Sequence, residues 1–100
     1  MKIRLIGDLF TCRGFGMAGV ETVVAEGEQQ IKEEFQNALE AEELAILFIT
    51  EKKADEIRNQ LEEQKMERKF PLIVEIPDKE GWQDRGKVLK LINRTLSIDV

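Results

Sequence analysis

The chain has 100 residues, 42% of them hydrophobic and 35% charged, and its 15 Lys and Arg against 20 Asp and Glu give a net charge of −5. This length suits one small domain, the hydrophobic content is too high for intrinsic disorder, and no apolar run reaches the roughly 18 residues of a membrane span. With no histidine and one cysteine, the composition excludes a histidine-based triad, an internal disulfide and ordinary zinc or haem sites, while the acidic balance argues against nucleic acid as a partner.

Four short apolar runs predict four β-strands, at residues 3–7, 22–25, 44–50 and 72–76. The third run has no polar residue among its first six positions. A strand that is apolar on both faces needs cover on both faces, which is typical of a parallel sheet flanked by helices. The third run is therefore the best candidate for the centre of the sheet.

Helical periodicity separates these runs. The segment 10–20 fits a short helix less clearly than the others, because it contains three glycines. The next helix carries an apolar stripe of Ile31, Phe35, Ala38 and Leu39. A further helix, which would begin at Thr50-Glu51, carries Ala54, Ile57 and Leu61. A last helix, capped by Asp84, carries Val88, Leu89, Ile92 and Leu96.

The order β-α-β-α-β-α-β-α, with right-handed crossovers, predicts an open α/β fold of the Rossmann or flavodoxin kind. We expect one domain over residues 1–100. Its core would span 1–77 as a four-stranded parallel sheet flanked by helices, followed by a loop over 78–83 and a C-terminal amphipathic helix over 84–98. The apolar residues of that last helix cover more than one face, which fits either a fully docked helix or one that packs on a partner.

Gly14-Phe15-Gly16-Met17-Ala18-Gly19 has the spacing G-x-G-x-x-G of a dinucleotide site. In such a site the glycines follow the first strand directly, so that a helix N-terminus meets the pyrophosphate. Here Asp8 to Arg13 intervene, and the second strand starts soon after Gly19. We therefore predict that the glycines end a helix and form a tight turn, and that no cofactor binds through them.

Two polar residues follow neighbouring strands, Asp8 after the first and Thr50 after the third. A phospho-receiver domain would need a second acid beside Asp8 and an aspartate near Thr50. Caps or loop anchors are the simpler interpretation of both, and a degenerate receiver-like regulatory domain remains the alternative. Cys12 has no nearby histidine or second thiol to lower its pKa, so we expect a half-buried packing residue.

The chain resembles the F subunits of the V-type and archaeal-type rotary ATPases over nearly its whole length. The resemblance rests on Lys-Ile-Arg-Leu-Ile-Gly-Asp at 2–8, Gly-Phe-Gly-Met-Ala-Gly-Val at 14–20 and Leu-Phe-Ile-Thr-Glu at 47–51. It continues with Pro-Leu-Ile-Val-Glu-Ile-Pro at 71–77 and a C-terminal amphipathic helix that ends Leu-Ser-Ile at 96–98. Each motif is weak alone, and together at this spacing they are fairly specific.

The resemblance implies a non-catalytic component of the central rotor shaft. Such a component clasps the coiled coil of the D subunit, called the shaft coiled coil below, and the pair couples ATP hydrolysis or synthesis in the head to proton or sodium transport through the membrane ring. It needs no cofactor or metal, does not enter the membrane, and is cytoplasmic and peripheral to the membrane as part of the soluble stalk.

Contact residues carry over from the resemblance as a hypothesis. They are Phe15, Met17 and Val20 from the glycine-containing segment, and Arg85, Ile92 and Leu96 from the final helix. The family often has Arg-Leu where this chain has Gly16-Met17, so an arginine-mediated contact at that place is missing.

Overall fold

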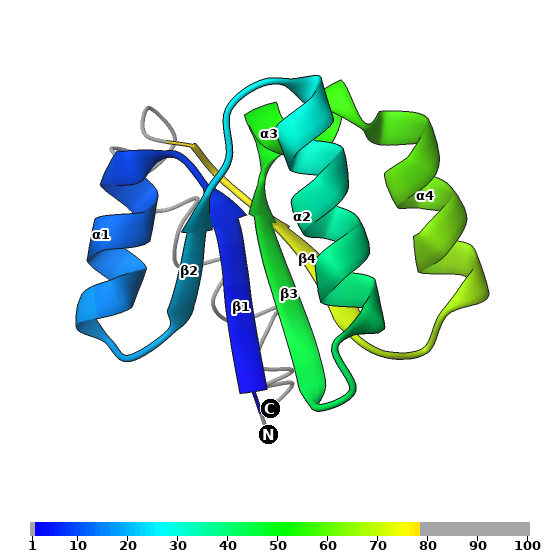
Figure 1. Ribbon diagram of the computed structural model, residues 1–100, viewed down its shortest axis with the longest axis horizontal. Helices are drawn as coiled ribbons and strands as arrows, with labels where there is room; N and C mark the ends of the chain where they lie inside the picture. The colour runs from blue at the N-terminus through cyan, green and yellow to red at the C-terminus, as the bar shows by residue number, and fades with distance from the viewer. Residues whose placement is uncertain (1, 79–100) are drawn as a thin grey trace, which may run out of the picture.

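Strands and helices alternate along the chain, as the apolar periodicity predicts (Figure 1). The computed structural model describes residues 2–78. Within this range the elements are β1 (Lys2–Gly7), α1 (Leu9–Met17), β2 (Glu21–Val24), α2 (Glu28–Glu40), β3 (Leu44–Thr50), α3 (Glu51–Glu56), α4 (Arg58–Glu67) and β4 (Leu72–Ile76). The predicted loop over 78–83 and helix over 84–98 lie outside it except for Asp78. No helix within the described range is long and apolar enough to cross a bilayer.

The four strands form one parallel sheet in the order β2-β1-β3-β4. Leu5 of β1 lies beside Phe48 of β3, which in turn lies beside Val74 of β4. The chain thus turns from β1 to β2 on one side and then crosses to β3 and on to β4 in the opposite direction. Right-handed crossovers therefore place α1 on one face of the sheet and α2, α3 and α4 on the other. The predicted Rossmann-like α/β fold with a four-stranded parallel sheet is confirmed.

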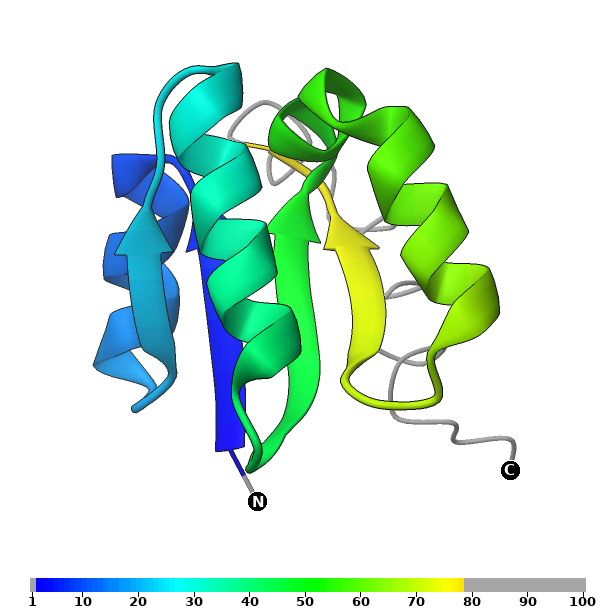
Figure 2. The same ribbon diagram turned by 45° about the vertical axis from the view of Figure 1, so that its right-hand side comes forward.

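The helices are divided unequally between the two faces of the sheet. Figure 2 shows α2, α3 and α4 in front of the sheet and α1 behind it. The larger core lies under the three helices and joins Phe35 of α2 to Leu47 and Ile49 of β3. The smaller core lies on the other face, where Leu5, Cys12 and Ile76 are buried together with half-buried Phe15, Val20, Phe48 and Val74.

The helix expected from Thr50-Glu51 onward is two helices, which corrects the single helix predicted from the sequence. Ile57 lies between α3 and α4, and its φ of −128° and ψ of 32° fall outside the helical region. The predicted apolar stripe is nevertheless correct, because Ala54, Ile57 and Leu61 are all buried in the larger core. The backbone break at Ile57 leaves the buried apolar stripe intact, because the Ile57 side chain is buried although its backbone is not helical.

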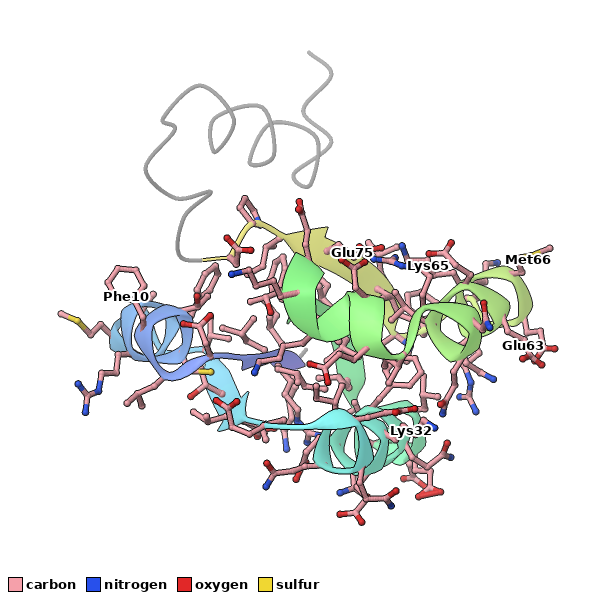
Figure 3. All side chains as sticks on the ribbon, turned by 90° about the horizontal axis from the view of Figure 1, so that it is seen from above. Phe10, Lys32, Glu63, Lys65, Met66 and Glu75 are labelled. Carbon is pink, nitrogen blue, oxygen red and sulfur yellow. The ribbon has the colours of Figure 1, made fainter. Side chains whose placement is uncertain are left out.

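An ion network holds α4 against β4. Arg58 reaches both carboxylate oxygens of Glu75, with Nη1–Oε2 at 2.7 Å and Nη2–Oε1 at 2.9 Å, and Lys65 Nζ lies 2.8 Å from Oε2. Figure 3 shows Lys65 and Glu75 side by side where α4 lies over β4. The hydrogen bonds from Arg58, helped by Lys65, lower the pKa of Glu75 in spite of its partial burial. The network therefore depends on an ionised Glu75.

Glu75→Gln should lower the stability of the fold at neutral pH and change its pH dependence. A depressed folded-state pKa adds stability above the unfolded-state value near 4.3, and this stability is lost as the pH falls through the folded-state pKa. We expect the variant to unfold about 1 kcal/mol more easily at pH 7, a discounted value because Arg58 is over a third exposed. Urea titrations of both proteins between pH 7 and pH 3 should show the difference shrinking in acid. A constant difference would contradict the role given to Glu75.

Candidate partner-binding surface

Helix α1 is positioned by a cap at each end. At its start the Asp8 carboxylate accepts hydrogen bonds from the Thr11 amide, at 3.0 Å, and from the Thr11 hydroxyl, at 2.7 Å. Burial raises the pKa of Asp8, but these hydrogen bonds and the charge of Lys53 outweigh it and lower the pKa overall. Asp8 is thus an ionised helix cap, in agreement with the simpler interpretation of the sequence.

A Schellman turn ends the same helix. The Val20 amide donates to the Phe15 carbonyl at 3.2 Å, and the Gly19 amide donates to the Gly16 carbonyl at 3.0 Å. Gly19 has φ +88°, a conformation that favours glycine. The G-x-G-x-x-G motif therefore lies in the second half of a helix and in its terminating turn, as predicted, and away from the helix N-terminus that a dinucleotide would need.

The inward face of α1 is narrow. Thr11 and Cys12 are buried, and the Phe15 ring packs against Phe48 of β3 with ring centroids 5.8 Å apart. The Cys12 thiol points at the Val23 carbonyl at 3.5 Å, and its 3% exposure makes it fully buried where half-burial was expected. Burial, together with the charge of Asp8, raises the pKa of Cys12, so the thiol stays protonated and is a packing residue.

The outward face of α1 is apolar and exposed. Leu9 is 51%, Phe10 58% and Met17 90% exposed. Arg13 is also exposed and lies between them along the helix. These side chains border one open groove along the helix. An exposed apolar strip of this kind is typical of a surface that binds another protein.

The structure separates the contact residues predicted from the sequence. Met17 points outward, whereas Phe15 and Val20 are half-buried against the smaller core. Arg85, Ile92 and Leu96 lie outside the described residues. Leu9 and Phe10 were not predicted, although Phe10, Gly14 and Met17 follow the spacing i, i+4, i+7 of one helix face. That spacing, counted from a cap at Asp8, is the signal that could have identified them.

Polar residues also lie at the carboxyl edge of the sheet, near the ends of β1 and β3. Thr50 at the end of β3 is 1% exposed, and a Cβ on Gly7 would lie 3.0 Å from its Cγ2, so the two strand ends pack tightly. Lys53 follows in α3 and reaches Glu26 at 3.2 Å. Thr50 precedes α3 without a side-chain capping bond. Within residues 2–78 no three His, Cys, Asp or Glu residues are close enough together to hold a metal ion. Lys53 thus ties α3 to the segment that precedes α2, and the contact of Thr50 with Gly7 packs the ends of β3 and β1 together.

Comparison with known proteins finds matches that extend over nearly the whole chain. Residues 3–92 match the family of the ATP synthase (F/14-kDa) subunit. A protein from Methanothermobacter thermautotrophicus, named as the F subunit of an A-type ATP synthase, is 34% identical, with 99% of this chain and 95% of the relative covered. Proteins of the same name from Pyrococcus furiosus and Methanocaldococcus jannaschii are 35% and 32% identical, each over 100% of this chain and 98% and 99% of their own.

Proposed function

Since this chain belongs to the family of the ATP synthase (F/14-kDa) subunit, we propose that it is the F subunit of a rotary ATPase. In this proposal it is a non-catalytic part of the central rotor and binds the shaft coiled coil. The observation that carries the proposal is the family match, which covers 90 of the 100 residues, from 3 to 92. The proposal includes coupling between ATP hydrolysis or synthesis and the transport of protons or sodium ions. It also includes a cytoplasmic position, peripheral to the membrane.

The exposed face of α1 supports a role in assembly. A component of a larger complex needs a surface that its neighbours can cover, and such surfaces combine apolar anchors with a polar rim. Among the described residues, seven large hydrophobic side chains are exposed, and three of them lie on α1. This helix is therefore the described element best suited to meet a partner.

The fixed placement of α1 supports a mechanical role. Its N-terminus is capped by Asp8, its C-terminus is closed by the Gly19 turn, and its inward face is anchored by Phe15 on the central strand. A helix held at three points presents its outward side chains in one orientation. A rotor component gains from this because a partner that turns with it requires a stiff contact.

A binding experiment tests the proposed partner. The shaft coiled coil encoded by the same genome would be immobilised, and the purified chain passed over it at micromolar concentration. We expect saturable retention, and no retention on an unrelated two-stranded coiled coil of similar length and charge. If the shaft coiled coil retains no more of the chain than that control does, the proposed partner is wrong.

A second experiment tests the non-catalytic role within the machine. The ATP-hydrolysing head would be assembled with the shaft coiled coil, with and without this chain, and ATP hydrolysis measured in both. We expect the isolated chain to hydrolyse no ATP, and the assembly containing it to hydrolyse ATP at least as fast as the assembly without it. Hydrolysis by the isolated chain would contradict the proposal.

A further inference from the structure

We infer that the outward face of α1 is a seat for close contact with one helix of the shaft coiled coil, with Gly14 at its centre. The α1 seat consists of Leu9, Phe10, Arg13, Gly14 and Met17. The inference rests on the proposed function, because it names the residues that hold the same partner.

The first observation is the glycine at position 14, in the interior of α1. Glycine is the weakest helix former after proline, yet Gly14 lies in the interior of α1. A Cβ added there would meet no heavy atom of residues 2–78 within 4 Å, whereas one added to Gly7 would meet Thr50 at 3.0 Å. Gly19 differs again, because its φ of +88° itself favours glycine. At Gly14 neither crowding by the described residues nor backbone conformation calls for a glycine, which points to a partner that approaches the helix backbone there.

The side chains around Gly14 supply the second observation. Phe10 lies one turn before Gly14 and Met17 lies about one turn after it, and they are 58% and 90% exposed. They stand about 10 Å apart along the axis, at 1.5 Å per residue. A crossing helix fits between them and can pass closer to the backbone at Gly14 than the usual separation of roughly 8–10 Å between helix axes. Leu9 widens the apolar strip at its N-terminal end.

Arg13 gives the seat its charge selectivity. It is exposed and forms no salt bridge with any of the described residues, although the chain as a whole carries a net charge of −5. In coiled coils, charged residues flank the apolar seam. An Asp or Glu beside the seam of the partner helix would therefore face Arg13, and such complementary charges fix orientation more than they add affinity.

The same arginine argues against a second copy of this chain as the occupant. A two-fold contact centred on Gly14 would bring Arg13 of both copies close together, since the two residues are adjacent on the helix. Like charges placed face to face in an interface are unfavourable. An acidic position on a different helix removes that conflict.

Gly14→Ala tests the inference because it should move two properties in opposite directions. Alanine stabilises a helix relative to glycine where its methyl group meets no other atom. The melting temperature of the isolated chain should therefore rise by about 4 °C or more. The affinity for the shaft coiled coil, measured by calorimetry, should fall about tenfold because the new methyl group prevents close approach. Met17→Glu should weaken binding at least as much without a large change in melting temperature.

Met66→Glu is the matched control, because Met66 is 87% exposed on α4, at the opposite end of the molecule from Phe10 in Figure 3. It should leave affinity for the shaft coiled coil unchanged. Normal binding by Gly14→Ala and Met17→Glu, or a lower melting temperature for Gly14→Ala, would overturn the inference and leave the proposed function standing. If the wild-type chain itself fails to bind the shaft coiled coil, both fall. A wild-type homodimer that Met17→Glu dissociates would assign the seat to a second copy and overturn the inference.

Discussion

Phe35→Ala should reduce the free energy of unfolding by about 3–5 kcal/mol. Phe35 is 0% exposed and is the largest of the fully buried side chains among the described residues. It carries the contact of α2 with the larger core, where Ile31 and Leu39 lie beside it along the helix. Removing the ring leaves a cavity, and the close-packed helix and strands around it can collapse into that cavity only in part.

Urea unfolding followed by circular dichroism measures this loss. Gln36→Ala is the matched control, because Gln36 is the next residue of the same helix and is exposed; its stability should change by less than about 0.5 kcal/mol. A loss below about 1 kcal/mol for Phe35→Ala would mean that α2 does not seal the larger core. Because a small domain is stable by only about 5–15 kcal/mol, the variant should also melt at a much lower temperature.

Phe48→Ala should reduce the free energy of unfolding by about 3 kcal/mol, the low end of the usual range for this change. Phe48 lies in β3 between Leu5 and Val74 and is half-buried. It supports α1 through the Phe15 ring at 5.8 Å. The substitution therefore removes both part of the smaller core and the support of α1, the helix that carries the proposed partner-binding surface.

A double-mutant cycle with Phe15→Ala separates these two effects. The pair should show a coupling free energy of roughly 0.5–1.5 kcal/mol, as expected for neighbouring aromatic rings. Leu72→Ala takes the place of Phe15→Ala in a control cycle with Phe48→Ala, because Leu72 lies on the adjacent strand and is 51% exposed. Additive losses for Phe15 and Phe48 would show that the rings do not act together and that α1 is held mainly by its caps.

The sheet could be predicted closely because its signal is local. Each of the four apolar runs became a strand within one residue of the expected ends, and the uninterrupted run at 44–50 became β3. The break at Ile57 could not be predicted, because a buried Ile57 satisfies the helical stripe whether or not the backbone is helical there. Hydrophobic periodicity reports which residues are buried, and it is insensitive to one non-helical residue.

The proposed partner-binding surface was harder to predict than the fold. Sequence reasoning grouped Phe15, Met17 and Val20 by their place in one motif, whereas the structure turns Met17 outward and Phe15 and Val20 toward the sheet. The difference comes from the rotational phase of α1, which is fixed by the Asp8 cap and by the contact of Phe15 with Phe48. A short helix rich in glycine carries too weak an apolar pattern to fix that phase. The contacts predicted for Arg85, Ile92 and Leu96 remain predictions.

Co-expression with the shaft coiled coil encoded by the same genome, followed by size-exclusion chromatography with light scattering, is the most direct test of the stalk assignment. A stable one-to-one heterodimer whose formation is lost in Met17→Glu and kept in Met66→Glu would agree with a rotor component bound through α1. A monomer at the chain's own mass of 11.5 kDa, eluting apart from the shaft coiled coil, would contradict the assignment.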